Sequence, residues 1–97
     1  MAKYILLTNW TDQGIKNVKD SPKRLDAAKA LAKKLGGELR KFYMTIGAYD
    51  VVVVLEAPDD DAAAKFALTL GSAGNVRTTT LKAFSEPSYR AILGSLP

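Results

Sequence analysis

The chain is 97 residues long, with 47% hydrophobic and 25% charged residues and a net charge of +4. It contains neither cysteine nor histidine, which excludes disulfides, thiolate nucleophiles, Cys or His metal sites and any catalytic triad built on a histidine base. The length predicts one domain over residues 1–97, and the lack of a long apolar run or leader-like N-terminus predicts a cytoplasmic location without a membrane span.

Residues 1–37 predict a strand followed by a helix. Residues 3–10 (KYILLTNW) are rich in β-favouring side chains and apolar on both faces, which is typical of a central strand. A short helical turn is expected over residues 12–19. Ser21 and Pro22 suit the cap and first turn of a helix, because proline lacks an N–H that the first turn cannot pair. An apolar stripe at helical spacing continues to residue 35, where two glycines stop the helix.

A hairpin occupies the middle of the chain. Residues 38–46 alternate imperfectly and predict an edge strand, whereas residues 51–57 begin with four valines and predict a second central strand. Between them, Gly47-Ala48-Tyr49-Asp50 predicts a turn, because glycine tolerates a positive φ and aspartate can bond backbone amides. The two faces of the edge strand are predicted as Arg40, Phe42, Met44 and Ile46 against Leu39, Lys41, Tyr43 and Thr45.

The last third predicts a helix, a strand and a final helical segment. Asp59-Asp60-Asp61 lies at the positive end of a helix that stops at Gly71, and we expect it to cap that helix rather than bind a metal, since calcium-loop spacing is missing. Residues 76–84 predict a strand and residues 85–94 a short helix. The order β-α-β-β-α-β predicts an α+β, ferredoxin-like sandwich with a four-stranded antiparallel sheet.

The two central strands imply a partner. Helices would cover one face of the sheet, yet residues 3–10 and 51–57 carry apolar side chains on both faces. A second copy of the chain is the simplest cover for the other face. We therefore expect a homodimer or higher homo-oligomer in the form of a dimeric α+β barrel.

Several segments are similar to those of a known family. They are Gly47-Ala48-Tyr49-Asp50, Thr11-Asp12-Gln13-Gly14-Ile15, Lys34-Leu35-Gly36-Gly37, Phe42-Tyr43, Glu56-Ala57-Pro58-Asp59 and Gly74-Asn75-Val76-Arg77. The sequence resembles the GYD domain family, which takes its name from the first of these, over nearly the whole chain. The resemblance implies a dimeric α+β barrel of the ferredoxin-like type, with no established activity for the family as a class.

The predicted topology brings polar residues to one edge of the sheet, where the first two strands end and the last two begin. We expect a small-ligand site there, with Asp50 as a base or anchor, Arg77 as an anion clamp and a tyrosine as a hydrogen-bond donor. The candidate ligand-binding residues are Asn9, Trp10, Tyr43, Tyr49, Asp50, Arg77 and Thr79. The alternative is structural: Asp50 serves the turn, Arg77 pairs with Asp50, and Trp10 belongs to the core.

Three functions remain open. The favoured one is a homo-oligomeric small-molecule-binding or structural module, with no catalytic residue, metal or cofactor assigned. The second is a cofactor-free barrel enzyme, monooxygenase- or isomerase-like, acting on a small aromatic or acidic substrate; a ring-sized apolar pocket near Trp10 and Asp50 would favour it. The third is a weak nucleic-acid-binding regulatory module, which is disfavoured because no aromatic residues interleave the basic residues between positions 16 and 41.

Overall fold

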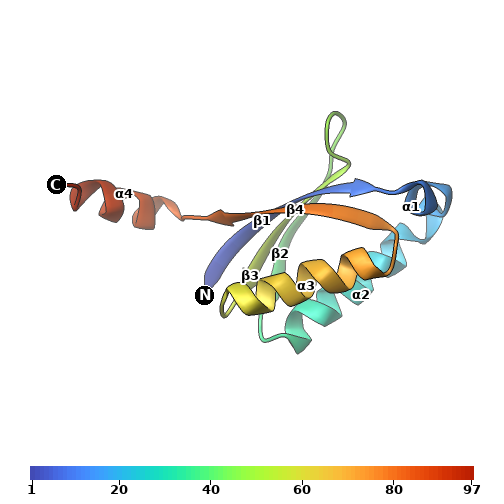
Figure 1. Ribbon diagram of the computed structural model, residues 1–97, viewed down its shortest axis with the longest axis horizontal. Helices are drawn as coiled ribbons and strands as arrows, with labels where there is room; N and C mark the ends of the chain where they lie inside the picture. Colours follow the sequence, from blue (N-terminus) through green and yellow to red (C-terminus); the bar gives the residue numbers. More distant parts are fainter.

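The computed structural model describes all 97 residues and has two layers, a sheet and a pair of helices (Figure 1). The elements in order are β1 (Ala2–Trp10), α1 (Asp12–Lys16), a 3-10 turn η1 (Val18–Asp20), α2 (Ser21–Lys34), β2 (Glu38–Met44), β3 (Val51–Ala57), α3 (Asp60–Ser72), β4 (Val76–Ala83) and α4 (Glu86–Gly94). The strand order is β2-β3-β1-β4, and every neighbouring pair is antiparallel. The predicted α+β, ferredoxin-like topology is confirmed.

The edge strand β2 differs from its predicted form in length and in alternation. It ends at Met44, so the loop to β3 comprises the six residues 45–50 rather than the predicted four residues 47–50. The register shifts between Leu39 and Lys41, so that Leu39 and Phe42 oppose Leu55 and Val53, which point to the helices. A β-bulge at Arg40 thus places Leu39 and Phe42 on one face, and the predicted face assignment of this strand was wrong.

The helix ends show which side chains satisfy the first backbone amides. Asp59 accepts a hydrogen bond from the Ala62 N–H at 2.9 Å, which confirms the capping role predicted for the acidic run. Helix α2 contains Pro22 in its first turn as expected, but Asp20 rather than Ser21 occupies the cap position.

The core lies between the sheet and helices α2 and α3. Leu6, Leu55 and Phe66 are at most 1% exposed, and burial of each such side chain stabilises the fold by about 1.5–3 kcal/mol. The helices contribute mainly alanines to this contact, among them Ala32 and Ala63. Small residues let the helices lie close to the sheet.

Gly14 explains how α1 is anchored. A Cβ at this position would lie 1.9 Å from the Asn75 carbonyl oxygen, so the backbones of α1 and the α3–β4 loop touch. Thr11 strengthens the contact, because its N–H donates to the Asn75 carbonyl at 3.0 Å and its hydroxyl donates to the Gly74 carbonyl at 2.5 Å. The glycine that weakens the helix is required by this packing.

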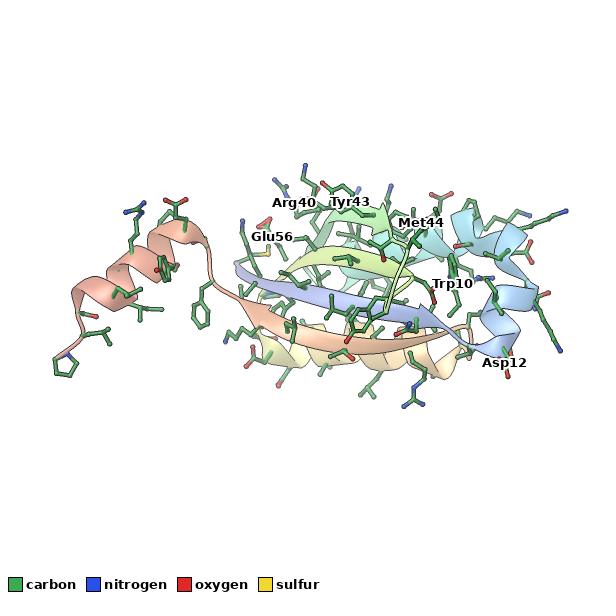
Figure 2. All side chains as sticks on the ribbon, turned by 90° about the horizontal axis from the view of Figure 1, so that it is seen from above. Trp10, Asp12, Arg40, Tyr43, Met44 and Glu56 are labelled. Carbon is green, nitrogen blue, oxygen red and sulfur yellow. The ribbon has the colours of Figure 1, made fainter.

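The second face of the sheet has no helix over it. Figure 2 looks onto this open face, with the four strands side by side and the helices behind them. By strand alternation and register, its centre is formed by the apolar residues Ile5, Leu7, Val52, Val54 and Leu81. We call these five residues the open-face patch.

Helix α4 extends away from the rest of the molecule (Figure 1). No element of the two layers packs closely against it, and its apolar residues are exposed. Tyr89, Ile92 and Leu93 recur at helical spacing and form one stripe, and the exposed Leu96 follows the end of the helix. No helix of the chain combines the length and the hydropathy of a membrane-spanning segment.

A polar contact joins β1 to the start of α3. The buried Tyr4 hydroxyl donates to Asp60, and Lys82 on β4 lies 3.2 Å from the same carboxylate. This hydrogen bond, together with burial, raises the pKa of Tyr4 to about 12, and it lowers the pKa of Asp60. Both shifts stabilise the folded state, Tyr4 as the neutral phenol and Asp60 as the carboxylate.

The raised pKa of Tyr4 predicts a specific pH dependence. Its contribution is complete below pH 10, the ordinary pKa, and is lost as pH rises through about 12. We therefore expect the stability advantage of the natural chain over Tyr4→Phe to shrink between about pH 10 and about pH 12 in urea unfolding. Tyr89→Phe is the matched control, since Tyr89 is exposed on α4. An advantage that stays constant between pH 10 and pH 12 would show that folding does not raise the pKa of Tyr4.

Candidate functional site

The loop of residues 45–50 is tied to the end of β1 by hydrogen bonds. The Asp50 N–H donates to the Thr8 carbonyl, and the Trp10 N–H donates to the Asp50 carboxylate, both at 2.9 Å. The Asn9 amide donates to the Ala48 carbonyl, also at 2.9 Å. Asp50 therefore continues the pairing of β1 and β3 beyond its last ladder residue.

The loop is also closed on itself. The Thr45 hydroxyl donates to the Tyr49 carbonyl at 2.6 Å, and the Thr45 N–H donates to the Asp50 carbonyl at 2.8 Å. Gly47 has a φ of +139°, which an L side chain rarely adopts, as the turn prediction required. The Asp50 carboxylate has the structural role that the sequence allowed, and Arg77 forms no ion pair with it.

The sequence-predicted site residues are divided between places. Asn9, Trp10, Tyr49 and Asp50 meet at the loop, with Arg77 beside Asn9 on β4. The remaining two lie farther along the open face: Thr79 pairs with Leu7, and Tyr43 pairs with Val52. Tyr43 and Arg77 are on opposite edge strands, about 14 Å apart at three strand spacings. A joint ligand role for all seven residues stays a prediction.

A cavity of about 340 Å³ lies under Trp10 on the helix-covered face. Its floor is formed by strand residues such as Thr8, Val51 and Val53, and its walls by α2 and the C-terminal half of α3. Of the 18 lining residues, 13 are hydrophobic. Trp10 is the one member of the predicted ligand set that lines this space. The indole of Trp10 therefore belongs to the cavity wall, and the other six residues lie outside it.

Both small and large side chains border the cavity. On the α2 side Ala27 and Ala28 line it beside Leu25 and Leu31, and on the α3 side Phe66, Leu70 and Ala73 do so. A longer side chain in place of Ala28 would therefore extend into the open space.

Arg24 is the charged residue of the cavity wall. It lies one turn before Ala28 on α2, and its guanidinium donates to the Asn17 carbonyl at 3.0 Å and to the Gly14 carbonyl at 3.2 Å. These bonds hold the guanidinium against the α1 segment, where the Arg24 side chain borders the cavity. The sequence counted Arg24 among the solvated basic residues, yet its helical spacing from Ala28 and Leu31 places it on their face.

The lining residues define what the cavity can do. Thr8, Ser21, Thr69 and Asn75 add hydroxyl and amide groups, while Arg24 is the lining residue with an ionisable side chain. The arrangement can hold an apolar body and offer hydrogen bonds to one end of it. The ring-sized space near Trp10 meets the size criterion set for an enzyme, but the Asp50 carboxylate is bonded to the Trp10 amide rather than directed into the cavity.

Asp50 provides a test of the loop. Replacing it by alanine leaves the part-buried Trp10 N–H without its acceptor, and we expect a loss of about 1–3 kcal/mol in the free energy of unfolding. Asp50→Asn keeps an acceptor oxygen and should lose less. Denaturant unfolding of both variants measures the difference, with Asp61→Asn on α3 as the control. Unchanged stability in Asp50→Ala would contradict the structural role of Asp50 and favour its predicted role in ligand binding.

Comparison with known proteins is consistent with this architecture. Residues 4–93 match the model of the GYD domain. A relative from Thermus thermophilus, named glutamine synthetase and cystathionine beta-lyase binding protein, is 34% identical over 84 residues, covering 86% of this chain and 88% of the relative.

A structural neighbour supports the fold alone. The crystal structure of MtbAldR superposes with a TM-score of 0.68 at 14% sequence identity, over 88% of this chain. The match covers 52% of the MtbAldR chain, so the present chain corresponds to about half of that protein. Because the domain match spans nearly all residues and a relative shares a third of them, this chain belongs to the GYD domain family.

Proposed function

We propose that this protein is a non-catalytic, homodimeric binding module in which two copies pair through the open faces of their sheets. The observation that carries the proposal is the open-face patch, because Ile5, Leu7, Val52 and Val54 lie on the two central strands with no cover from their own chain. Contiguous apolar surface of this kind marks an interaction site.

The shape of the patch suits a second copy. A sheet with four strands, each about seven residues long, presents a face of roughly 450 Å², so two paired faces bury roughly 900 Å². A stable dimer needs about 1,200–2,000 Å² in total. The sheet faces supply most of this area, and neighbouring exposed apolar segments must supply the rest.

Two such segments flank the open face. The loop of residues 45–50 rises from the sheet on the side away from α2 and α3, and its Ile46 is 99% exposed (Figure 1). Phe84, at the end of β4, is 63% exposed and leads into the apolar stripe of α4. Both segments would reach past the edge of the sheet toward a copy stacked on it.

The rim of the open face is polar, as in other protein interfaces. On the β2 edge, the Arg40 guanidinium lies 3.0 Å from the Glu38 carboxylate and 3.2 Å from the Glu56 carboxylate. Figure 2 shows Arg40, Glu56 and Tyr43 on this side of the open face. Arg77 and Thr79 occupy the β4 edge. An apolar centre with a polar rim fits a second copy better than a lipid surface, which would favour an unbroken basic rim.

Replacing Leu7 by lysine tests the dimer. The charged group would lie at the centre of the paired faces, and we expect dimer affinity to fall by about a hundredfold or more, because burial of an unpaired charge costs several kcal/mol. Leu68→Lys is the matched control, since Leu68 is 73% exposed on α3. Sedimentation velocity at micromolar concentration measures both variants, with circular dichroism to verify folding. A natural chain that sediments as a monomer would overturn the proposal.

A second candidate function is the binding of metabolic enzymes. The name of the relative states that it binds glutamine synthetase and cystathionine beta-lyase, and the two chains share 34% identity over most of their lengths. We propose that the present chain, as a dimer, likewise binds another protein. The exposed apolar side chains of α4 would contribute to the contact.

This second function is tested with purified enzymes. We expect the natural chain to bind glutamine synthetase or cystathionine beta-lyase saturably in biolayer interferometry, and Leu7→Lys to bind more weakly because each monomer offers a single contact. Leu68→Lys should behave as the natural chain does. The absence of saturable binding to either enzyme would reject enzyme binding and leave the dimer proposal to its own test.

A further inference from the structure

We propose that the cavity under Trp10 binds a small aromatic or branched monocarboxylate, with its apolar body between the helices and the sheet and its carboxylate at Arg24. The cavity lies on the helix-covered face, whereas the proposed dimer uses the opposite face. The two proposals are therefore independent, and each can fail without the other.

The volume and lining set the size of the ligand. The cavity encloses about 340 Å³, roughly twice the volume of an engineered 150 Å³ apolar cavity that binds benzene. It also lies at the lower end of the range for small-molecule sites, about 300–1,000 Å³. Phe42, Leu70 and Trp10 border the space, so a single ring or branched chain finds apolar contacts on several sides.

Arg24 sets the charge of the ligand. The ion pairs of the chain are made by Arg40, Lys82 and Arg90, which leaves the Arg24 guanidinium without a carboxylate partner. The guanidinium uses two of its five N–H donors on backbone carbonyls, and the others remain for a ligand. A single cation on the border of an apolar cavity complements a ligand with one anionic end.

Thr8 adds a polar group inside the cavity. It is the one buried polar residue of the chain, at 6% exposure, and it lies on the cavity floor. Its hydroxyl is used in no hydrogen bond with another side chain or with the backbone, while the hydroxyls of Thr45 and Thr69 are both bonded to carbonyls. No buried side-chain nitrogen or oxygen of the chain lacks a partner, so the unbonded Thr8 hydroxyl is accessible from the cavity and free to contact a ligand there.

The experiment uses the full chain and two probes of equal shape. 3-Phenylpropanoate carries the carboxylate, and 3-phenylpropanamide replaces it by a neutral amide. Trp10 is the single tryptophan and lines the cavity, so its fluorescence reports occupancy directly. We expect saturable quenching by the carboxylate, with binding of the amide weaker by about tenfold or more.

Two variants assign the binding to the cavity and to Arg24. Arg24→Gln should weaken binding of the carboxylate probe by about tenfold or more and leave binding of the amide probe nearly unchanged. Arg24→Lys should recover part of the lost affinity because it restores the positive charge. Ala28→Leu fills the cavity and should remove binding of both probes without lowering the melting temperature, since added apolar atoms enter empty space. Melting temperatures of all variants verify folding.

The outcomes are decisive. Saturable binding that depends on the carboxylate, on Arg24 and on the open space at Ala28 supports the proposal. No saturable change in Trp10 fluorescence up to millimolar probe would overturn it. Equal binding of both probes, or unchanged binding in a folded Ala28→Leu, would overturn it as well.

Discussion

The antiparallel pair β1–β3 imposes the constraint on which the rest of the structure depends. Both strands carry apolar side chains on both faces, so both faces of the sheet need cover. A chain this short has enough residues to cover one face. Helices α2 and α3 cover one face, and no helix of the chain covers the other. The loop at residues 45–50 fixes this pair in register, because Asp50 bonds both to Thr8 and to the Trp10 amide.

The helix-covered face is not completely filled either. The helices bury alanines against the sheet, and near Trp10 the residues that line the space, Leu31 and Leu70 among them, leave about 340 Å³ open. A filled core would contribute more to stability. The molecule thus has two apolar surfaces that its own chain leaves uncovered, the open face of the sheet and the half-open cavity under Trp10.

Hydrophobic periodicity and end signals were sufficient to predict the topology, the strand order and the cap at Asp59, because these depend on local spacing. The bulge at Arg40 was not predicted, because one inserted residue reverses the alternation without changing the composition of the strand. The cavity was not predicted for another reason. Its size depends on the distance between the layers, which no pattern of residues along the chain encodes.

Helix α4 has a consequence for how relatives diverge. Because the two layers fold without close contacts to α4, substitutions on this helix escape the packing constraints that restrict residues such as Leu6 or Gly14. Selection can rewrite its apolar stripe at little risk to folding. The exposed surface of the C-terminal segment can therefore change while the sheet and its turn stay the same.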